Sequence, residues 1–89
     1  MTTQPQLEPT IEQRKIIYQA RRGIKELDIF IDPYVKQHYL HASDAEQHAF
    51  AKLLSHEDPD LLNFFMDLDK PAEPDVANLI AKLKQLVQS

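Results

Sequence analysis

The stretch DPDLLNFFMDL, residues 58–68, decides the fold class. It opens with Asp58-Pro59, an acidic residue followed by a proline, a pair that favours the first turn of a helix. Most of the positions from 61 to 68 are apolar, and at helical spacing they fall on more than one side of the helix. We therefore expect a helix that is buried on most sides and lies at the centre of the molecule.

Helix signals continue on both sides of this stretch. Downstream, Pro71 and Pro74 frame a short connector, and apolar residues then recur every three or four positions. Upstream, Ser43 and Glu46 have the spacing of a capping box, in which the serine oxygen accepts from the third backbone amide. The apolar residues expected to face the core from these two helices are Ala45, Ala49, Phe50, Leu53, Leu54, Val76, Leu79, Ile80, Leu83, Leu86 and Val87.

The first helix is expected to run from Thr10 to the only glycine of the chain, Gly23. Thr10 and Gln13 have capping-box spacing. Arg21 and Arg22 would then lie in the last turn, where cations are favourable beside the negative end of the helix dipole. Gly23 would end the helix in the left-handed conformation, which costs a glycine nothing sterically.

A second helical segment starts at Ile24, and Pro33 interrupts it. Proline lacks a backbone N–H and disfavours helical geometry at the preceding residue, Asp32. Asp32 and Pro33 could instead begin a new helix, as cap and first residue. We expect a kink or a short break at this point, followed by helix to about Leu40.

These signals predict five helical segments joined by short loops, which is an all-α fold, a single small helical bundle. The chain has 89 residues, enough for one modest core but not for two domains. We expect residues 1–9 to be a flexible N-terminal arm and residues 10–89 to be a single helical-bundle domain.

Composition excludes several classes of function. The net charge is −4, and residues 43–89 carry nine acidic but only four basic side chains. A general nucleic-acid binder needs a dominant basic face, which this balance argues against. The chain has no cysteine, so it has no disulfide, thiolate metal site or cysteine nucleophile. No membrane span, signal peptide or transit peptide is recognisable, and we expect a protein of the bacterial cytoplasm without direct membrane insertion.

The residue types that carry catalysis do not form a recognisable motif. His38 and His41 are three residues apart and could share a helix face, but His48 and His56 lie beyond the next helix start. The acidic residues between positions 57 and 75 lack the spacing and the glycine of a calcium loop, and solvated carboxylates at helix ends explain them. No serine is placed for a triad. We expect no metal site, no catalytic residue and no enzymatic activity.

The densest polar cluster is the segment RRGIKELD, residues 21–28, which we call the corner. A purely structural interpretation suffices locally, because Arg21 and Arg22 complement a helix dipole, Gly23 caps and Glu26 lies in a first turn. The functional interpretation is a docking edge that offers guanidinium, backbone and carboxylate groups together. We expect a bulky side chain at Gly23 to break the corner sterically.

At these residues the chain resembles the SdhE-type FAD assembly factors, also called succinate dehydrogenase assembly factors. The hallmark Arg-Gly-x-x-Glu stands here as residues 22–26, RGIKE, without any departure. The stretch DPDLLNFFM at residues 58–66, followed by Lys70-Pro71, resembles the second landmark of the family. The resemblance covers residues 14–72, and it is the pair of landmarks at this separation that makes it specific.

The resemblance implies a small helical protein that is not itself an enzyme. It implies that the chain binds the immature flavoprotein subunit of succinate dehydrogenase, fumarate reductase or both, and promotes covalent attachment of FAD to a histidine there. FAD would be attached to the partner, with no cofactor tightly bound to this chain. The partner-binding residues implied are Arg22, Gly23 and Glu26, with Arg21, Lys25 and Asp28 as flanking contacts. Arg22 would either pair with a carboxylate of the partner or brace Glu26.

Three alternatives stay open at this point. The first is a generic helical protein–protein interaction module in which the corner is only a helix cap. The second is a helix-turn-helix nucleic-acid binder that uses the basic residues of the first two helices, which are Arg14, Lys15, Arg21, Arg22 and Lys25. The third is a metal-binding bundle that uses the histidines.

Overall fold

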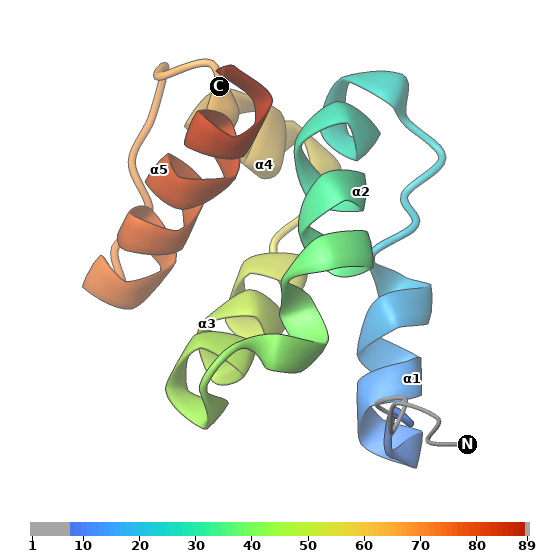
Figure 1. Ribbon diagram of the computed structural model, residues 1–89. Helices are drawn as coiled ribbons and strands as arrows, with labels where there is room; N and C mark the ends of the chain where they lie inside the picture. The colour runs from blue at the N-terminus through green and yellow to red at the C-terminus, as the bar shows by residue number, and fades with distance from the viewer. Residues whose placement is uncertain (1–7, 89) are drawn as a thin grey trace.

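The computed structural model describes residues 8–88, and within this range the chain consists of helices and loops (Figure 1). The elements are α1 (Ile11–Gln19), α2 (Lys25–Gln37), the short 3-10 helix η1 (Tyr39–His41), α3 (Asp44–Leu54), α4 (Asp58–Phe65) and α5 (Pro74–Gln88). The prediction of a small all-α bundle with five helices is confirmed. The expected arm falls mainly on residues 1–7, outside the described residues, so the division into an arm and one domain stays a prediction.

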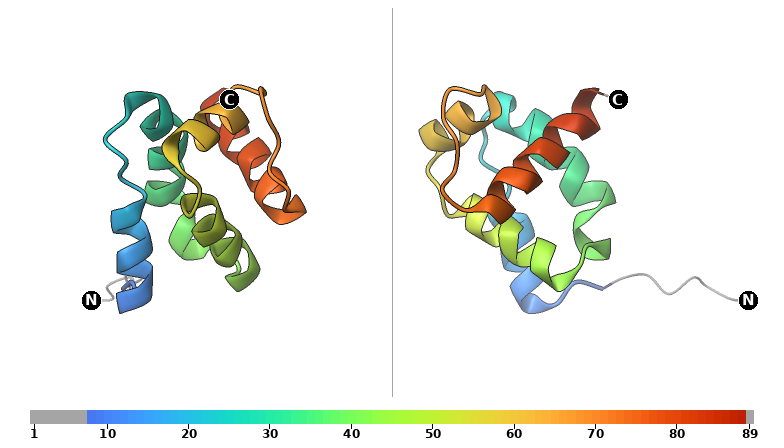
Figure 2. Two further views of the ribbon diagram at one scale, coloured as in Figure 1. Left: turned by 180° about the vertical axis from the view of Figure 1, so that it is seen from behind. Right: turned by 90° about the vertical axis from the view of Figure 1, so that its left-hand side faces the viewer.

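Helix α2 forms the centre of the bundle. It packs against α5 and α4, and α5 also packs against α3. Helix α1 lies on the side of α2 away from α5, and it contacts α3 (Figure 2). The rings of Phe30 in α2 and Phe65 in α4 stack with centroids 4.6 Å apart. The α2 side chains of Leu27, Ile31 and Tyr34 are fully buried. Because apolar burial is the main stabilising term, this helix organises the core.

The expectation that the helix of residues 58–68 is central and buried on most sides is wrong. Helix α4 ends at Phe65, and Asp67 adopts a left-handed backbone conformation with φ 62°. The Leu68 N–H donates to the Asn63 carbonyl at 2.8 Å, which closes the helix end in a Schellman-type turn. Met66 and Leu68 therefore lie beyond the helix, with exposed fractions of 61% and 76%.

Of the kink or short break expected at Pro33, the break is not found. Helix α2 continues through Pro33 without a break and ends at Gln37, after which the chain continues in η1. A proline inside a helix removes one backbone hydrogen bond. Here Ile31 and Tyr34, on either side of it, are completely buried, and this tertiary packing outweighs the local preference.

The two predicted capping boxes differ in outcome. At Thr10 both hydrogen bonds of the box are present. At Ser43 only the serine oxygen takes part, accepting from the Glu46 N–H at 3.1 Å. The side chain of Glu46 instead accepts from the Tyr34 hydroxyl at 2.7 Å and from Lys82 at 3.1 Å. Glu46 thereby joins α3 to α2 and α5.

The tyrosine of this link lies in an aromatic cluster at the heart of the bundle. Tyr34, Tyr39 and Phe50 pack with ring centroids 4.9 to 6.4 Å apart. Burial, reinforced by the neighbouring Glu46 carboxylate, raises the pKa of Tyr34 far above its ordinary value. Two of the expected core positions are wrong, because Ala45 and Val87 are exposed.

Within residues 8–88, none of the helices has the length and apolar character needed to cross a membrane.

Candidate functional site

The corner consists of residues 21–24, which connect α1 to α2, and residues 25–28, which form the first turn of α2. Helix α1 ends at Gln19 with Ala20 as its C-cap, so the prediction that Arg21 and Arg22 form the last turn is wrong. The Ala20 N–H donates to the carbonyls of Ile16 and Ile17, which closes the helix before either arginine. Gly23 consequently turns the chain into α2 and does not end α1.

Gly23 has the predicted left-handed conformation, with φ 74°. A Cβ built on Gly23 meets no atom within 4 Å, so the first atom of a side chain has room there, and the expected effect of a bulky side chain stays a prediction. The need for glycine is therefore conformational, since other L-residues are strained at this φ. The open surroundings leave this edge accessible to another molecule.

Arg22 points across the molecule to the junction of α3 and α4. Its Nη2 donates to the carbonyl of Leu54, the last residue of α3, and to that of His56 at 3.2 Å. Its Nη1 lies 3.4 Å from Oδ1 of Asp58, the first residue of α4. A cation here satisfies carbonyls at a helix C-terminus, where the dipole favours positive charge. These contacts all lie within the chain and away from Glu26, so Arg22 does not brace Glu26 in this structure, and its pairing with a carboxylate of the partner stays a prediction.

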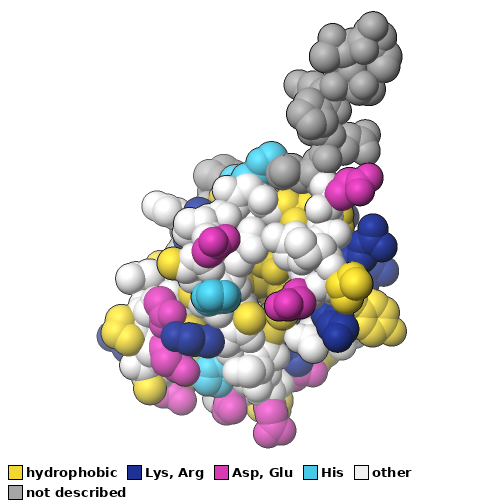
Figure 3. Space-filling view, turned by 90° about the horizontal axis from the view of Figure 1, so that it is seen from below, with side chains coloured by type: hydrophobic (Ala, Val, Ile, Leu, Met, Phe, Trp, Pro, Cys, Tyr) yellow, Lys and Arg dark blue, Asp and Glu magenta, His cyan; other side chains and the backbone are white. Residues whose placement is uncertain are grey.

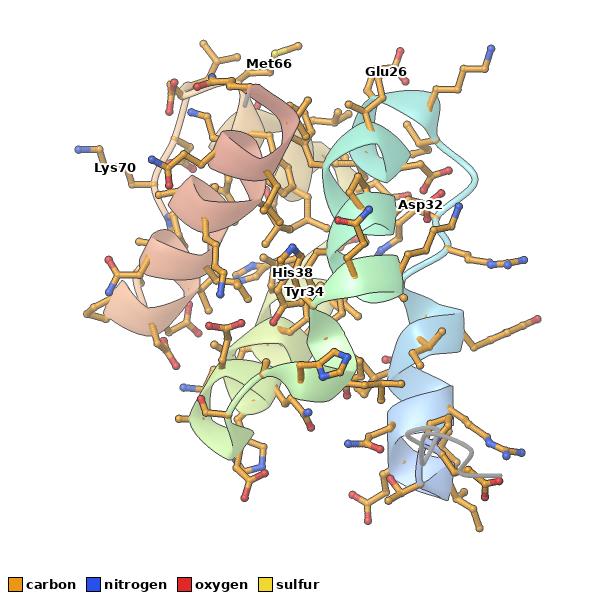
Figure 4. The ribbon with its side chains drawn as sticks, viewed as in Figure 1. Glu26, Asp32, Tyr34, His38, Met66 and Lys70 are labelled. Carbon is orange, nitrogen blue, oxygen red and sulfur yellow. The ribbon has the colours of Figure 1, made fainter. Side chains whose placement is uncertain are left out.

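The other predicted site residues lie around Arg22 and its contacts to Leu54, His56 and Asp58, which together we call the anchor. Arg21, Lys25 and Glu26 are exposed, and Glu26 lies at the free end of α2, directed away from the bundle (Figure 4). As an acidic residue in the first turn of α2, Glu26 is favourable to the helix dipole. Asp28 is half-buried, and its Oδ1 is buried without a hydrogen bond from the described residues. The structure thus gathers the hallmark residues at one edge, with Arg22 facing inward and Glu26 outward.

Sequence reasoning missed two groups of residues around the corner. The partners of Arg22 come from the second landmark region, and no spacing rule predicts a contact over more than 30 residues. Ile29 and Tyr18 are exposed by 54% and 80% although they are apolar. Ile29 follows Glu26 by three residues, and this spacing on one helix face could have identified it as a neighbour.

The histidines and the hollows of the surface do not add a second site. Within residues 8–88 no group of three His, Asp or Glu side chains is arranged to hold a metal ion. A hollow of about 490 Å³ between α1 and α3 is lined by residues such as Gln13, Gln47 and His48, away from the corner. On the face shown in Figure 3, acidic and basic side chains are interspersed. Arg22 is one of the basic residues that the nucleic-acid-binding alternative would use. Because it is paired with Asp58 inside the chain, fewer of these residues remain for contact with phosphates.

Comparison with known proteins identifies the family. The Sdh5 family, described as "Flavinator of succinate dehydrogenase", matches residues 14–87. A protein of Psychrobacter arcticus named FAD assembly factor SdhE is 54% identical over 84 residues, which cover 94% of this chain and 90% of that protein. Proteins of the same name from Acinetobacter baylyi and Yersinia pseudotuberculosis are 51% and 37% identical, over 90% and 84% of this chain and 94% and 81% of their own lengths. The chain therefore belongs to the Sdh5 family of FAD assembly factors for succinate dehydrogenase.

Proposed function

We propose that this protein binds the immature flavoprotein subunit of succinate dehydrogenase in the bacterial cytoplasm, and promotes the covalent attachment of FAD to that subunit. The observation that carries the proposal is the opposite orientation of two hallmark residues. Arg22 is fixed inside the molecule, whereas Glu26, four residues later, presents a carboxylate without a partner among the described contacts. An anchored edge with an exposed charge is suited to contact a second protein.

The surroundings of Glu26 support the contact. Lys25 and Arg21 are exposed on the same edge, and Ile29 adds an exposed apolar side chain one helical turn from Glu26. Protein interfaces combine apolar contact with polar groups that fix the register. Gly23 has open space around it, which would allow a partner backbone to approach closely.

The chemical role that fits such an edge is positioning. Attachment requires the flavin methyl carbon and the target histidine of the subunit to be held in reactive geometry, and positioning alone can lower a barrier by several kcal/mol. A factor that binds the reactive conformation more tightly raises its population by that difference in affinity. In this proposal bond formation belongs to the flavoprotein, FAD is not tightly bound to this chain, and the factor is not an enzyme.

The test measures covalent flavin on the subunit. The flavoprotein is expressed alone, with the wild-type factor, with Glu26→Ala and with Glu12→Ala, and denaturing gels are read for flavin fluorescence at the subunit band. Glu12 is the matched control, because it is an exposed acidic residue in the first turn of α1. We expect a strong band with wild type and Glu12→Ala, and about a tenfold weaker stimulation with Glu26→Ala.

Circular dichroism decides how a weak band is interpreted. Glu26→Ala should keep the helical signal of the wild type, because the side chain is exposed, and an unfolded variant would remove the support for a binding role. Equal bands in all lanes with a folded factor would contradict the proposal and favour the generic interaction module. The same assay with the fumarate reductase flavoprotein tests the second expected partner.

A further inference from the structure

We propose that Asp58, in the second landmark of the sequence, is a positioning residue for the corner, and that it acts through Arg22. The two landmarks would then work as one unit, in which the start of α4 holds the edge that presents Glu26. This inference rests on the function proposed for Glu26. It extends that function to a residue that lies outside the hallmark and is not itself offered as a partner contact.

The connector has few polar restraints besides those of Arg22, although the partly buried Ile24 packs against the core. Gly23 is exposed and has nothing within 4 Å of the position of a Cβ. The N-cap of α2 is Ile24, which makes no side-chain capping hydrogen bond, so the first turn of α2 lacks the usual local support. Arg22 directly precedes the pair Gly23-Ile24, and its contacts to Leu54, His56 and Asp58 restrain the chain at this point.

Within this anchor, Asp58 supplies the charge that orients the guanidinium. Arg22 and Asp58 have side chains exposed by only 19% and 33%, and their closest atoms are 3.4 Å apart. The Asp58 Oδ1 atom is buried and has no hydrogen bond from the described residues, so its described interaction is the ion pair with Arg22. An ion pair that is partly removed from water is stronger than one on the surface. Without it, the guanidinium would keep only the two carbonyls.

The first experiment measures hydrogen exchange and does not depend on the partner. In α2 the amides of Leu27 and Asp28 donate to the Ile24 carbonyl at 3.0 and 2.9 Å, so they report on the first turn after the connector. We expect Asp58→Asn to accelerate exchange of these two amides severalfold, although residue 58 is distant in sequence. The matched control is Asp75→Asn, which removes an acidic residue in the first turn of α5 that is paired with Lys52 at 3.0 Å. Unchanged exchange in Asp58→Asn, or equal acceleration in both variants, would overturn the proposal.

The second experiment places Asp58→Asn in the flavin-attachment assay, alone and combined with Glu26→Ala. If Asp58 acts through the corner, Asp58→Asn reduces stimulation severalfold alone and adds no further loss when Glu26 is already alanine. If Asp58→Asn acted by a general loss of folded protein, it would reduce stimulation by the same factor in the wild-type and the Glu26→Ala backgrounds. That result would overturn the positioning role. Should Asp58→Asn not fold, Arg22→Lys serves as the second variant, since it keeps the charge but not the planar set of donors. Absence of stimulation by the wild type would contradict the proposed function, and the exchange experiment would still decide whether Asp58 holds the corner.

Discussion

Two of the polar links between distant segments of this molecule are built from opposite charges. In one, the Arg22 guanidinium joins the α1–α2 connector to the α3–α4 junction. In the other, the Glu46 carboxylate of α3 accepts from Tyr34 of α2 and from Lys82 of α5. The Glu46 link adjoins the aromatic cluster of Tyr34, Tyr39 and Phe50, whereas the Arg22 link holds a connector in which the apolar packing comes from the partly buried Ile24.

The difference indicates which link the function depends on. Where buried rings already fix three helices, a carboxylate adds to an arrangement that apolar burial stabilises. Where a glycine connector with one partly buried residue leads to an exposed edge, the polar contacts of Arg22 are a main restraint on its geometry. We therefore expect changes at Arg22 to alter the corner and changes at Glu46 to alter mainly the stability of the bundle.

The largest effect is expected from Arg22→Ala. The change leaves the Leu54 and His56 carbonyls and the Asp58 carboxylate without their shared donor. We expect the free energy of unfolding to fall by about 2 to 3 kcal/mol, because the pair is only partly exposed. Urea denaturation measures this loss, and Lys52→Ala is the control, since its pair with Asp75 is exposed and should contribute about 0.5 kcal/mol or less. Equal losses in the two variants would contradict the special role of Arg22.

A smaller effect is expected when the second link is cut by Tyr34→Phe. The change removes the hydroxyl that donates to Glu46 at 2.7 Å but keeps the ring in the aromatic cluster. Glu46 keeps its pair with Lys82, so we expect a loss of about 1 to 2 kcal/mol. Thermal unfolding monitored by circular dichroism measures it. Flavin attachment should be unchanged for the folded fraction, and a loss of stimulation there would remove the distinction between the two links.

The sequence predicts local features of the molecule but neither of the two links. Local signals predicted the capping residues Thr10 and Ser43 and the left-handed Gly23, because such features depend on neighbours within a few residues. The helix end expected near Arg21 and the break expected at Pro33 are not found, and at Pro33 the packing of the buried Ile31 and Tyr34 outweighs the local preference. The long-range partners of Arg22 and Glu46 could not be predicted, because contacts across 12 to 36 residues leave no spacing pattern.

The same limit applies to the candidate site. The hallmark pattern predicted that Arg22, Gly23 and Glu26 belong together, and the structure does bring them to one edge. That Arg22 faces inward and Glu26 outward depends on where the α3–α4 junction lies in space. Asp58 was interpreted only as the start of a helix, and its position beside Arg22 follows from the tertiary fold.

Gly23→Ala tests the conformational demand at the first link. Since a Cβ at this position meets nothing within 4 Å, the cost should come from the φ of 74° alone, about 1 kcal/mol. Denaturant titration measures it. Asp67→Gly is the reciprocal variant, because Asp67 has φ 62° and a glycine there should relieve similar strain and raise the midpoint relative to Lys84→Ala, which removes the same exposed ion pair of Asp67 and Lys84. A loss several times larger for Gly23→Ala would mean that the edge is more crowded than the structure shows.

Acid should weaken the second link through Glu46, and this is the smallest effect we expect. Burial raises the pKa of Glu46, but the hydrogen bonds from Tyr34 and Lys82, with the nearby His38, outweigh burial and hold that pKa below its ordinary value. A carboxyl whose pKa is lower in the folded than in the unfolded state stabilises the fold above its ordinary pKa, near 4.5. This stability is lost as the pH falls below that value and through the pKa of the folded state.

Urea titrations of wild type and Glu46→Gln at pH 6 and pH 3 should show a difference in the free energy of unfolding of about 1 kcal/mol or less that shrinks in acid. The Arg22 guanidinium does not titrate in this range, and its bonds to the Leu54 and His56 carbonyls do not depend on pH. A difference between the two proteins that stays constant from pH 6 to pH 3 would show that the charge of Glu46 does not contribute to the link.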